Sequence, residues 1–464
     1  MIHANAETER LEACAALLDA GELPTEAPES PRGLGRASYR LRSLLARPDF
    51  RNGTLSLVDQ AIVSATTFAT SVIIGRLCLK EELGIFSLAL SIVYLARGVQ
   101  EQVISAPYVV YCHGRRGAAA SLYSGSSLVH QIILSALAML LLLGVLGLLS
   151  LGIGPPELAP AVWLLIAVLP LLQLREFIRR LAIAHLEIVS ATAIDLAVSV
   201  LQISGLVALA WFGRLTVVSA YATMGLACAL ASGLWFLLSK RPWRFAWSHA
   251  VDDWRHNWGF GRWALVSHMI GFTMPMMMPW VVTGICGAAE AGILAACTSI
   301  VGTASMFMTG LALYITPRAA RGYAQGGAAE LRRVLRTAST IYLGVLGSFA
   351  LTVLVGGNWL LAFAYGEKYA GYGPVMTLLA FGMLAGSMGL SVGIGLWAID
   401  RPQANLAADV CTLVVTLAIV VLLLEPLGVL AAALGDAVGR VAGSSVRYVT
   451  LRQLLKSSPP LAEA

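Results

Sequence analysis

The stretch LSLVDQAIVSATTFATSVIIGRLCLKEELGIFSLALSIVYLARGVQEQVISAPYVV, residues 55–110, decides the fold of this chain. It predicts two apolar helices joined by a short charged turn at residues 76–82. Each of these two helices is long enough to cross a bilayer, which takes about 20 apolar residues. The first helix carries Asp59 near its start, and the second carries Arg97 and Glu101 in its interior. Charges inside a spanning helix are costly and need partners or water, so these residues are functional candidates.

The whole chain has the composition of a membrane protein. Its 464 residues are 58% hydrophobic and only 12% charged, with a mean hydropathy of +0.76, which excludes a soluble domain of ordinary composition. The net charge of +6 does not indicate nucleic-acid binding, because the basic residues are scattered among short loops and form no patch. The sequence contains no P-loop, nucleophile elbow, HExxH or Cys/His metal cluster, so we expect no enzyme, cofactor or metal site.

Counting apolar segments of spanning length predicts an all-α polytopic protein with twelve transmembrane helices. The expected spans are 55–77, 83–111, 121–150, 158–180, 187–212, 215–238, 261–285, 288–315, 337–364, 372–397, 404–424 and 427–450. Lys and Arg fall mostly at alternate connections, such as Arg115 with Arg116, Arg175 with Arg179, and Lys240 with Arg241. Because cytoplasmic segments carry the excess of basic residues, this pattern predicts that both termini are cytoplasmic.

The second half of the chain repeats the first. Gly84 and Ser91 find counterparts in Gly292 and Ser299 at a single offset of 208 residues, and Asp195 falls opposite Asp409. Such a repeat predicts two lobes of six helices in the same orientation, with a substrate cavity between them. The expected division is a cytoplasmic extension (1–51, acidic then basic), an N-lobe (52–238), a cytoplasmic linker (239–260), a C-lobe (261–450) and a cytoplasmic tail (451–464).

Three stretches of the sequence resemble a known group. The opening DQAIVS at 59–64, the GIFSLA at 84–89 and the REFIRR at 175–180 are similar to the polysaccharide transporter branch of the multidrug/oligosaccharidyl-lipid/polysaccharide exporter (MOP) superfamily. The resemblance covers roughly residues 50–455, in pattern more than in identity. The acidic extension departs from the usual short N-terminus. The absence of two further C-terminal helices argues against the peptidoglycan-precursor flippases.

This resemblance implies a flippase of the bacterial inner membrane. Its substrate would be a polyprenyl-diphosphate-linked oligosaccharide, moved outward by alternating access for surface polysaccharide assembly. The expected partners are this lipid-linked oligosaccharide, membrane lipids and a coupling ion, H⁺ or Na⁺. One alternative is an ion-coupled multidrug or metabolite antiporter of the same fold. Another is a polytopic membrane transferase, which would need a catalytic residue such as Glu367 or Glu157 in an outer turn.

Arg97 is the first candidate for binding the headgroup. It lies about 20 Å along its helix at 1.5 Å per residue, near mid-membrane, and a guanidinium binds phosphate oxygens in pairs. The alternative is an ion pair with Glu101 one turn later. Arg262 begins the seventh span, where it either meets the headgroup at the cavity mouth or only anchors the topology.

The carboxylates of the spans suggest ion coupling. Asp59, Asp195 and Asp409 each lie within a few turns of the cytoplasmic face, where a buried carboxylate can carry a proton or coordinate Na⁺. Together with Glu101 they could instead lock each lobe, a role that the repeat favours for Asp195 and Asp409.

Three further features lie in the spans. Asp436 and Arg440 form a pair at helical spacing in the last span, for which we expect a structural role. Pro275 and Pro279 flank three methionines and predict a kink that could act as a hinge or only fill the core. His130 and His268 are expected to be hydrogen-bonded core residues.

Overall fold

The computed structural model describes residues 48–239 and 241–457; the side chains at 48–54, 57, 267, 270–275, 402 and 457 are outside the described part. The chain divides into two units, residues 1–55 and 56–464, and the helical bundle belongs to the second. Residues 1–47, most of the predicted N-terminal extension, lie outside the described residues.

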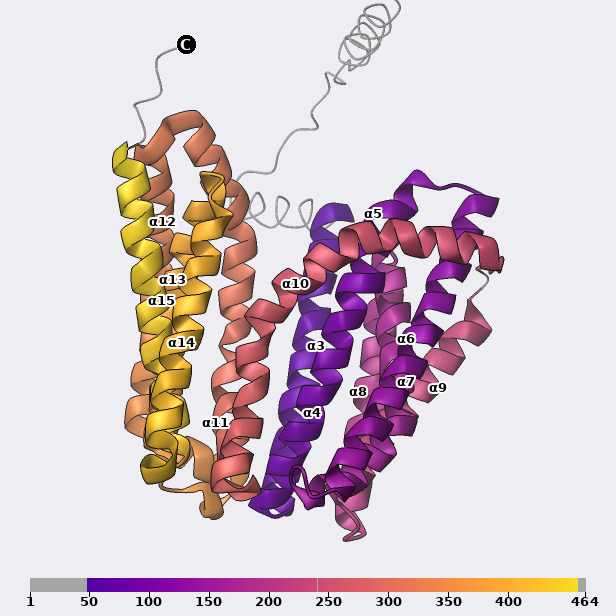
Figure 1. Ribbon diagram of the computed structural model, residues 1–464, viewed down its shortest axis with the longest axis horizontal. Coiled ribbons are helices and arrows are strands. Elements are labelled where there is room, and N and C mark those ends of the chain that lie inside the picture. Colours follow the sequence, from indigo (N-terminus) through magenta and orange to yellow (C-terminus); the bar gives the residue numbers. More distant parts are fainter. Residues whose placement is uncertain (1–47, 240, 458–464) are drawn as a thin grey trace, which may run out of the picture. The chain divides into compact units, whose positions relative to one another are not determined.

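The described chain is built of helices joined by short connections (Figure 1). The first six crossings are α3 (Pro48–Leu77), α4 (Lys80–Gln100) with a π-helical turn η1 (Glu101–Ser105), α5 (Ala106–Tyr111) and η2 (Cys112–Gly114), α6 (Ala118–Ser150), η3 (Pro156–Leu158) with α7 (Ala159–Ala184), α8 (Ile188–Trp211), and α9 (Val217–Leu238). The remaining elements are α10 (Trp247–Cys286), α11 (Ala288–Thr303), α12 (Ser305–Tyr365), η4 (Glu367–Tyr369), α13 (Gly373–Ala398), α14 (Pro402–Leu427) and α15 (Val429–Ser457).

The helix α12 contains parts of two crossings, because the chain reverses within it at Gly327, where φ is 58°. Only glycine adopts this left-handed conformation without strain. The first part of α12 continues α11, and the second part returns beside it, as the hydrogen bond from the Tyr342 hydroxyl to the Met308 carbonyl shows (2.9 Å). Ten described helices are long and apolar enough to span a membrane, with α12 counted once. The predicted fold class is confirmed: the chain is a multi-pass, all-α protein with twelve crossings in two six-helix lobes.

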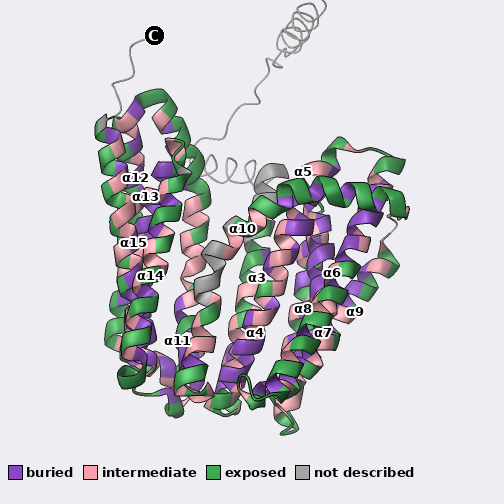
Figure 2. Cartoon of the chain, viewed as in Figure 1, coloured by how far each residue is buried: buried purple, intermediate pink, exposed green. Residues whose placement is uncertain are grey.

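The apolar surface faces outward, as lipid requires. The helices α6 and α14 have the highest mean hydropathies of the ten spans, 2.8 and 2.6. Only 17% of the residues in the apolar stretch of each helix are nevertheless buried. The less apolar α13 is 50% buried, in the middle of its lobe. Exposed residues therefore lie along the outer faces of the helices (Figure 2). This pattern would be unfavourable in water and is expected in a bilayer.

The two ends of the bundle differ in how the lobes meet. We call the end with connections 78–79, 212–216 and 366–372 the turn end, and the end with connections 112–117 and 399–401 the linker end. At the turn end one hydrophobic core includes residues from both lobes, such as Leu83 and Tyr365. At the linker end each lobe has its own core, around Phe177 in the N-lobe and around Leu331 in the C-lobe. The lobes therefore share one core at the turn end and have separate cores at the linker end.

Hydrogen bonds between the lobes reinforce this closure. The Tyr365 and Ser71 hydroxyls are 2.9 Å apart, and the Arg76 guanidinium donates to the Phe363 carbonyl at 3.0 Å. The Lys368 ammonium donates to the carbonyls of Arg76 and Cys78. These bonds tie the turn after α3 to the turn after α12.

The repeat is visible in hydrogen bonding as well as in sequence. The Glu82 carboxylate accepts a hydrogen bond from the Val217 backbone N–H at the start of α9, at 2.7 Å. The Glu290 carboxylate, 208 positions later, accepts one from the Val429 N–H at the start of α15, at 3.1 Å. A carboxylate at a helix N-terminus satisfies an otherwise unpaired N–H and complements the helix dipole. Each lobe thus holds its second and sixth crossings together in the same way.

Candidate functional site

A cavity of about 980 Å³ lies between the lobes. Its walls come from α3, α4, α7, α8 and α9 of the N-lobe and from α10, α11, α12, α13 and α15 of the C-lobe. Most of the lining is apolar or carries a hydroxyl group. Among the described residues, the charged lining side chains are four arginines and two carboxylates: Arg97, Arg175, Arg179, Arg440, Glu176 and Asp436. The charged surface of the cavity therefore has an excess of two positive charges.

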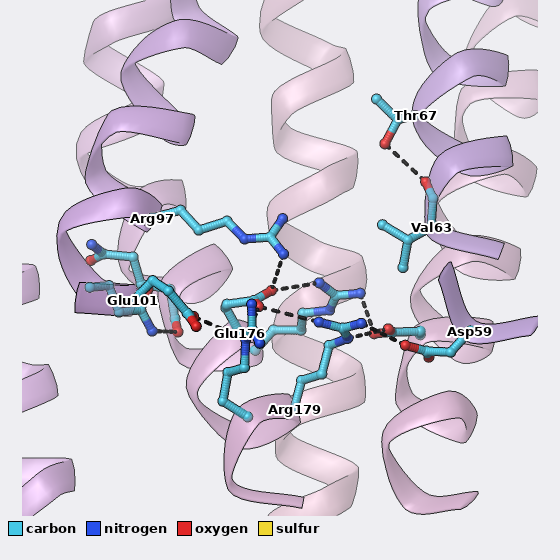
Figure 3. Close-up of polar contacts among 12 residues, drawn as sticks. Asp59, Val63, Thr67, Arg97, Glu101, Glu176 and Arg179 are labelled. Atoms are coloured by element: carbon cyan, nitrogen blue, oxygen red, sulfur yellow. Dashed lines mark hydrogen bonds and ion pairs between the residues drawn. The ribbon is translucent and has the colours of Figure 1, made fainter. Parts of the chain in front are cut away.

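On the N-lobe side, Glu176 of α7 is the centre of an ion-pair network (Figure 3). Its carboxylate lies 3.0 Å from an Arg97 nitrogen and 3.2 Å from nitrogens of Arg175 and Arg180. A nitrogen of Arg179 lies 3.4 Å away. The Glu176 side chain is only 4% exposed, so four guanidiniums stabilise one buried carboxylate. A carboxylate with this many partners stays neutralised when one of them leaves.

Two further carboxylates lie behind the cavity wall. The Arg179 side chain contacts Asp59 of α3 at 2.5 Å and Asp195 of α8 at 2.6 Å, and Arg175 also contacts Asp195. The Asp195 side chain is fully buried, and that of Asp59 is 5% exposed. The residues 175–180 on α7 therefore connect α3, α4 and α8 through charged groups. Such pairs cost desolvation free energy and fix the relative positions of the helices that carry them.

Counting all its members, the N-lobe network is neutral. It contains four arginines and four carboxylates: Arg97, Arg175, Arg179, Arg180, Asp59, Glu101, Glu176 and Asp195. Three of the arginines line the cavity, whereas Asp59 and Asp195 do not. The part of the network that faces the cavity, and therefore the substrate, is thus positively charged.

Among the described residues of the C-lobe, two ion pairs involve the last helix, α15. The Arg440 Nε donates to both carboxylate oxygens of Asp436, at 2.9 and 2.8 Å, and both residues line the cavity. Asp409 of α14 pairs with Arg447 of α15 outside the cavity lining. The repeat-related Asp195 and Asp409 therefore have different partners: the first contacts α7 and the second contacts the last helix. The lobes share a fold but not a charge network.

The structure corrects one sequence-based alternative. Arg97 and Glu101 do not pair with each other in the described structure; Arg97 contacts Glu176, and Glu101 contacts Arg180 at 3.0 Å. Both lie on the face of their helix that packs against α7, whose charged stretch offers each of them an oppositely charged partner. A π-helical turn also begins at Glu101 and interrupts the regular spacing along the helix. The charges are thus satisfied between helices.

Of the other predicted residues, Arg262 and His130 lie away from the cavity. Arg262 is exposed and stacks over the Trp263 ring, 5.5 Å from its centroid, outside the cavity lining. His130 is buried and hydrogen-bonded to the Ala250 carbonyl at 2.8 Å. Pro279 lines the cavity, whereas the Pro275 side chain lies outside the described part. The hinge role of the two prolines remains a prediction.

Sequence reasoning missed the central position of Glu176. The stretch REFIRR carries part of the family resemblance, and the basic pattern predicts that its arginines lie at the cytoplasmic end of a span. In the structure this stretch lies inside α7. The sequence contained a signal for this network. Arg175 and Arg179 are four residues apart, as are Glu176 and Arg180, so the two members of each pair lie on the same face of the helix. Charged side chains inside a membrane need oppositely charged partners. Asp59 and Asp195, which also lie inside spans, are such partners for the arginines of this stretch.

Within residues 48–239 and 241–457, no group of three or more His, Cys, Asp or Glu side chains is arranged to hold a metal ion. By sequence, no family model matches this chain, and no curated protein matches it.

By structure, the chain resembles transporters of one superfamily. An inward-facing multidrug resistance MATE family transporter of the MOP superfamily aligns with a TM-score of 0.70 at 15% identity, over 86% of this chain and 96% of that one. The lipid II flippase MurJ, in an inward closed conformation, aligns with a TM-score of 0.66 at 10% identity, over 86% and 87%. A MOP superfamily transporter from Pyrococcus furiosus aligns with a TM-score of 0.60 at 14% identity, over 93% and 99%.

These identities are too low to carry over a substrate, but the alignments span nearly the whole described chain. The all-helical, two-lobe arrangement of this chain agrees with them. The chain therefore has the fold of the MOP-superfamily transporters.

Proposed function

We propose that this protein is a membrane transporter that flips polyprenyl-diphosphate-linked oligosaccharide across the bacterial inner membrane for surface polysaccharide assembly. The observation that carries the proposal is the positively charged lining of the cavity between the lobes. A diphosphate headgroup needs cations inside the membrane, because an unpaired charge there costs several kcal/mol. Arginine suits this task, since its planar fork binds two phosphate oxygens at once.

Arg97 is the residue best placed to bind the headgroup. Its side chain is 35% exposed, whereas Glu176 beneath it is 4% exposed. When Arg97 turns toward a phosphate, Glu176 keeps Arg175, Arg179 and Arg180 as partners. The exchange leaves no buried carboxylate unpaired, so binding avoids the large cost of breaking a buried ion pair. The other members of the network then hold Arg97 in place and need not bind substrate themselves.

The apolar part of the cavity supports a lipid-linked substrate. Met276, Met278, Met306 and Met383 line the C-lobe wall. Unbranched thioether side chains adapt to irregular apolar groups, and a polyprenyl chain is such a group. The same cavity therefore offers cations for the diphosphate and adaptable apolar surface for the lipid beside it.

The arrangement of the lobes supports alternating access. They are joined at the turn end by a common core and by the contacts of Lys368 and Arg76, and they have separate cores at the linker end. The positive-inside pattern favours a cytoplasmic linker end and cytoplasmic termini. In this state the cavity would receive substrate from the cytoplasmic leaflet, where lipid-linked sugars are assembled.

A second candidate is an ion-coupled multidrug or metabolite antiporter. The observation in its favour is the neutral N-lobe network, in which one oxygen of the buried Asp59 carboxylate has no hydrogen-bond partner in the described structure. A proton or Na⁺ could occupy that position and couple transport to an ion gradient. An antiporter for cationic drugs would use carboxylates at the substrate surface, whereas arginines predominate there.

Deleting the gene in its native host tests the proposal. We expect lipid-linked oligosaccharide to accumulate in the cytoplasmic leaflet and one surface glycan to be lost, with recovery by the wild-type gene and not by an Arg97→Ala variant. Normal export of every surface glycan in a clean deletion would contradict the proposal. A deletion strain that is only sensitised to cationic dyes would favour the antiporter.

A further inference from the structure

The C-lobe wall of the cavity contains a charged pair that the proposed headgroup site does not use. Asp436 and Arg440 lie one turn apart on α15, and both line the cavity. Their side chains are 26% and 35% exposed, so they are accessible from the cavity. The N-lobe network is formed by other helices, and no ion pair among the described residues joins it to this pair.

The neighbouring helix makes room for this pair. A Cβ atom added to Gly382 of α13 would lie 3.0 Å from an Asp436 carboxylate oxygen, and one added to Gly386 would lie 3.1 Å from the Arg440 Nη1. These distances are shorter than ordinary van der Waals contacts. The two glycines, one turn apart, therefore form a flat surface on which both side chains lie. A fixed guanidinium binds an anion at lower entropic cost than a mobile one.

The hydrogen bonds of Arg440 leave its binding fork open. Its Nε donates to Asp436, and neither Nη1 nor Nη2 has a hydrogen-bond partner among the described residues. Arg447 on the same helix differs, because its Nε donates to Asn405 and its Nη2 to Asp409, and it does not line the cavity. The free pair of nitrogens on Arg440 has the geometry that binds two oxygens of a phosphate or carboxylate.

We propose that Arg440, held by Asp436 on the surface of Gly382 and Gly386, is a second oxyanion subsite of the transporter. This inference rests on the proposed function. The substrate would then carry two anionic groups, one for Arg97 in the N-lobe and one for Arg440 in the C-lobe. The second group is either the other phosphate of the diphosphate or an acidic group on the sugar. A ligand held by both arginines connects the two lobes.

Binding of defined probes to the purified full-length protein in nanodiscs tests the subsite. The probes are farnesyl monophosphate, farnesyl diphosphate, and farnesyl diphosphate linked to glucose or to glucuronic acid. The variants are Arg440→Gln, which removes the charge, and Arg440→Lys, which keeps the charge but loses the fork. Arg452→Gln is the matched control, because Arg452 is an exposed arginine on the same helix outside the cavity lining. Arg97→Gln reports on the headgroup site, and thermal melting of each variant checks folding.

We expect Arg440→Gln to raise Kd about tenfold or more for one class of probe, since the charge-assisted hydrogen bonds of the guanidinium are lost. If the second phosphate binds, the loss is seen with farnesyl diphosphate and is absent with the monophosphate. If an acidic sugar binds, the loss is seen with the glucuronosyl probe and is absent with the glucosyl probe. In both cases Arg440→Lys should give an intermediate Kd, and Arg452→Gln should bind as the wild type does.

The inference is wrong if folded Arg440→Gln protein binds every probe as tightly as Arg452→Gln does, or if Arg440→Lys restores full affinity. In either case a tenfold loss with Arg97→Gln would leave the proposed function standing. If the wild-type protein binds none of the probes, the proposed function fails, and the subsite fails with it.

Discussion

Gly84 of α4 and Gly292 of α11 lie against each other where the two lobes meet, and they occupy equivalent positions of the repeat. A Cβ on Gly84 would lie 1.9 Å from the Ala288 carbonyl oxygen, and a Cβ on Gly292 would lie 2.0 Å from the Lys80 carbonyl oxygen. Both pairs are related by the offset of 208 residues, so the contact is self-complementary, as in a two-fold symmetric dimer. The residues that reveal the repeat in the sequence are thus the ones that bring the lobes together.

Gly84→Ala should therefore disturb the closure at the turn end. The backbone carbonyl that faces the added methyl group cannot move as a side chain could, so the helices must separate. We expect a loss of about 1–3 kcal/mol in the free energy of unfolding, measured by denaturant titration in mixed micelles. Gly144→Ala on α6, where no atom lies within 4 Å of the added Cβ, should be nearly neutral. Equal stability of the two variants would contradict the close contact.

The repeat-related carboxylates Asp195 and Asp409 should differ sharply in their contribution to stability. Asp195 is fully buried between Arg175 and Arg179. In Asp195→Asn the network keeps four arginines but only three carboxylates, so one buried positive charge is uncompensated. We expect a loss of about 3–5 kcal/mol. Asp409 is 45% exposed beside Arg447, where an ion pair is worth about 0–1 kcal/mol, so Asp409→Asn should have little effect. Unfolding titrations of the two variants side by side check this, and similar losses would show that the network has no special role.

Arg97 provides a functional test that is separable from folding. Arg97→Ala should lower transport at least tenfold, because a charge-assisted contact worth about 1.5–3 kcal/mol is lost. Arg97→Lys should keep part of the activity, since it preserves the charge without the bidentate fork. Glu176 retains three arginines in both variants, so we expect wild-type melting temperatures. The control is Arg116→Ala, an exposed arginine outside the cavity lining. Full transport by a folded Arg97→Ala protein would remove the headgroup role.

Cys78 at the turn end reports on closure through its reactivity. Burial raises the pKa of its thiol to about 11, and only the thiolate reacts with maleimides. In a variant with Cys78 as its sole cysteine, labelling should be slow at pH 7 and rise about tenfold per pH unit toward 11. Lys368→Ala removes a nearby positive charge that lowers the pKa of this thiol, so labelling at pH 7 should become slower still. A cysteine introduced at the exposed Ile153 is the control for reagent access. Rapid labelling of Cys78 at pH 7 in the wild-type background would show that the turn end is open.

Much of the fold could be predicted from the sequence, because apolar segment length alone determines a crossing. The repeat follows from Gly84 and Gly292, whose spacing reflects a contact that tolerates no side chain. Segment length does not show where a chain reverses inside a continuous helix. The sequence consequently predicts a gap between two spans where the structure has a turn at Gly327 within α12.

The site was less predictable, since periodicity shows which residues share a helix face but not which helices meet. Arg97 and Glu101 stand out in the sequence as costly charges, but their partners on α7 are more than seventy residues away in the chain. The start of a span at Arg262 suggests a position at the cavity mouth. In the structure α10 first runs across the linker end and then turns along the bundle (Figure 1), and Arg262 lies outside the cavity lining.

Transport by the purified protein in proteoliposomes tests the central claim most directly. The substrate is a fluorescent farnesyl-diphosphate-linked oligosaccharide, and movement is followed by quenching of the outer leaflet with a membrane-impermeant reductant. We predict protein-dependent movement between leaflets that is lost with Arg97→Ala and kept with Arg116→Ala. No protein-dependent movement of this lipid, together with exchange of a cationic dye for H⁺ or Na⁺ by the same vesicles, would contradict the flippase account.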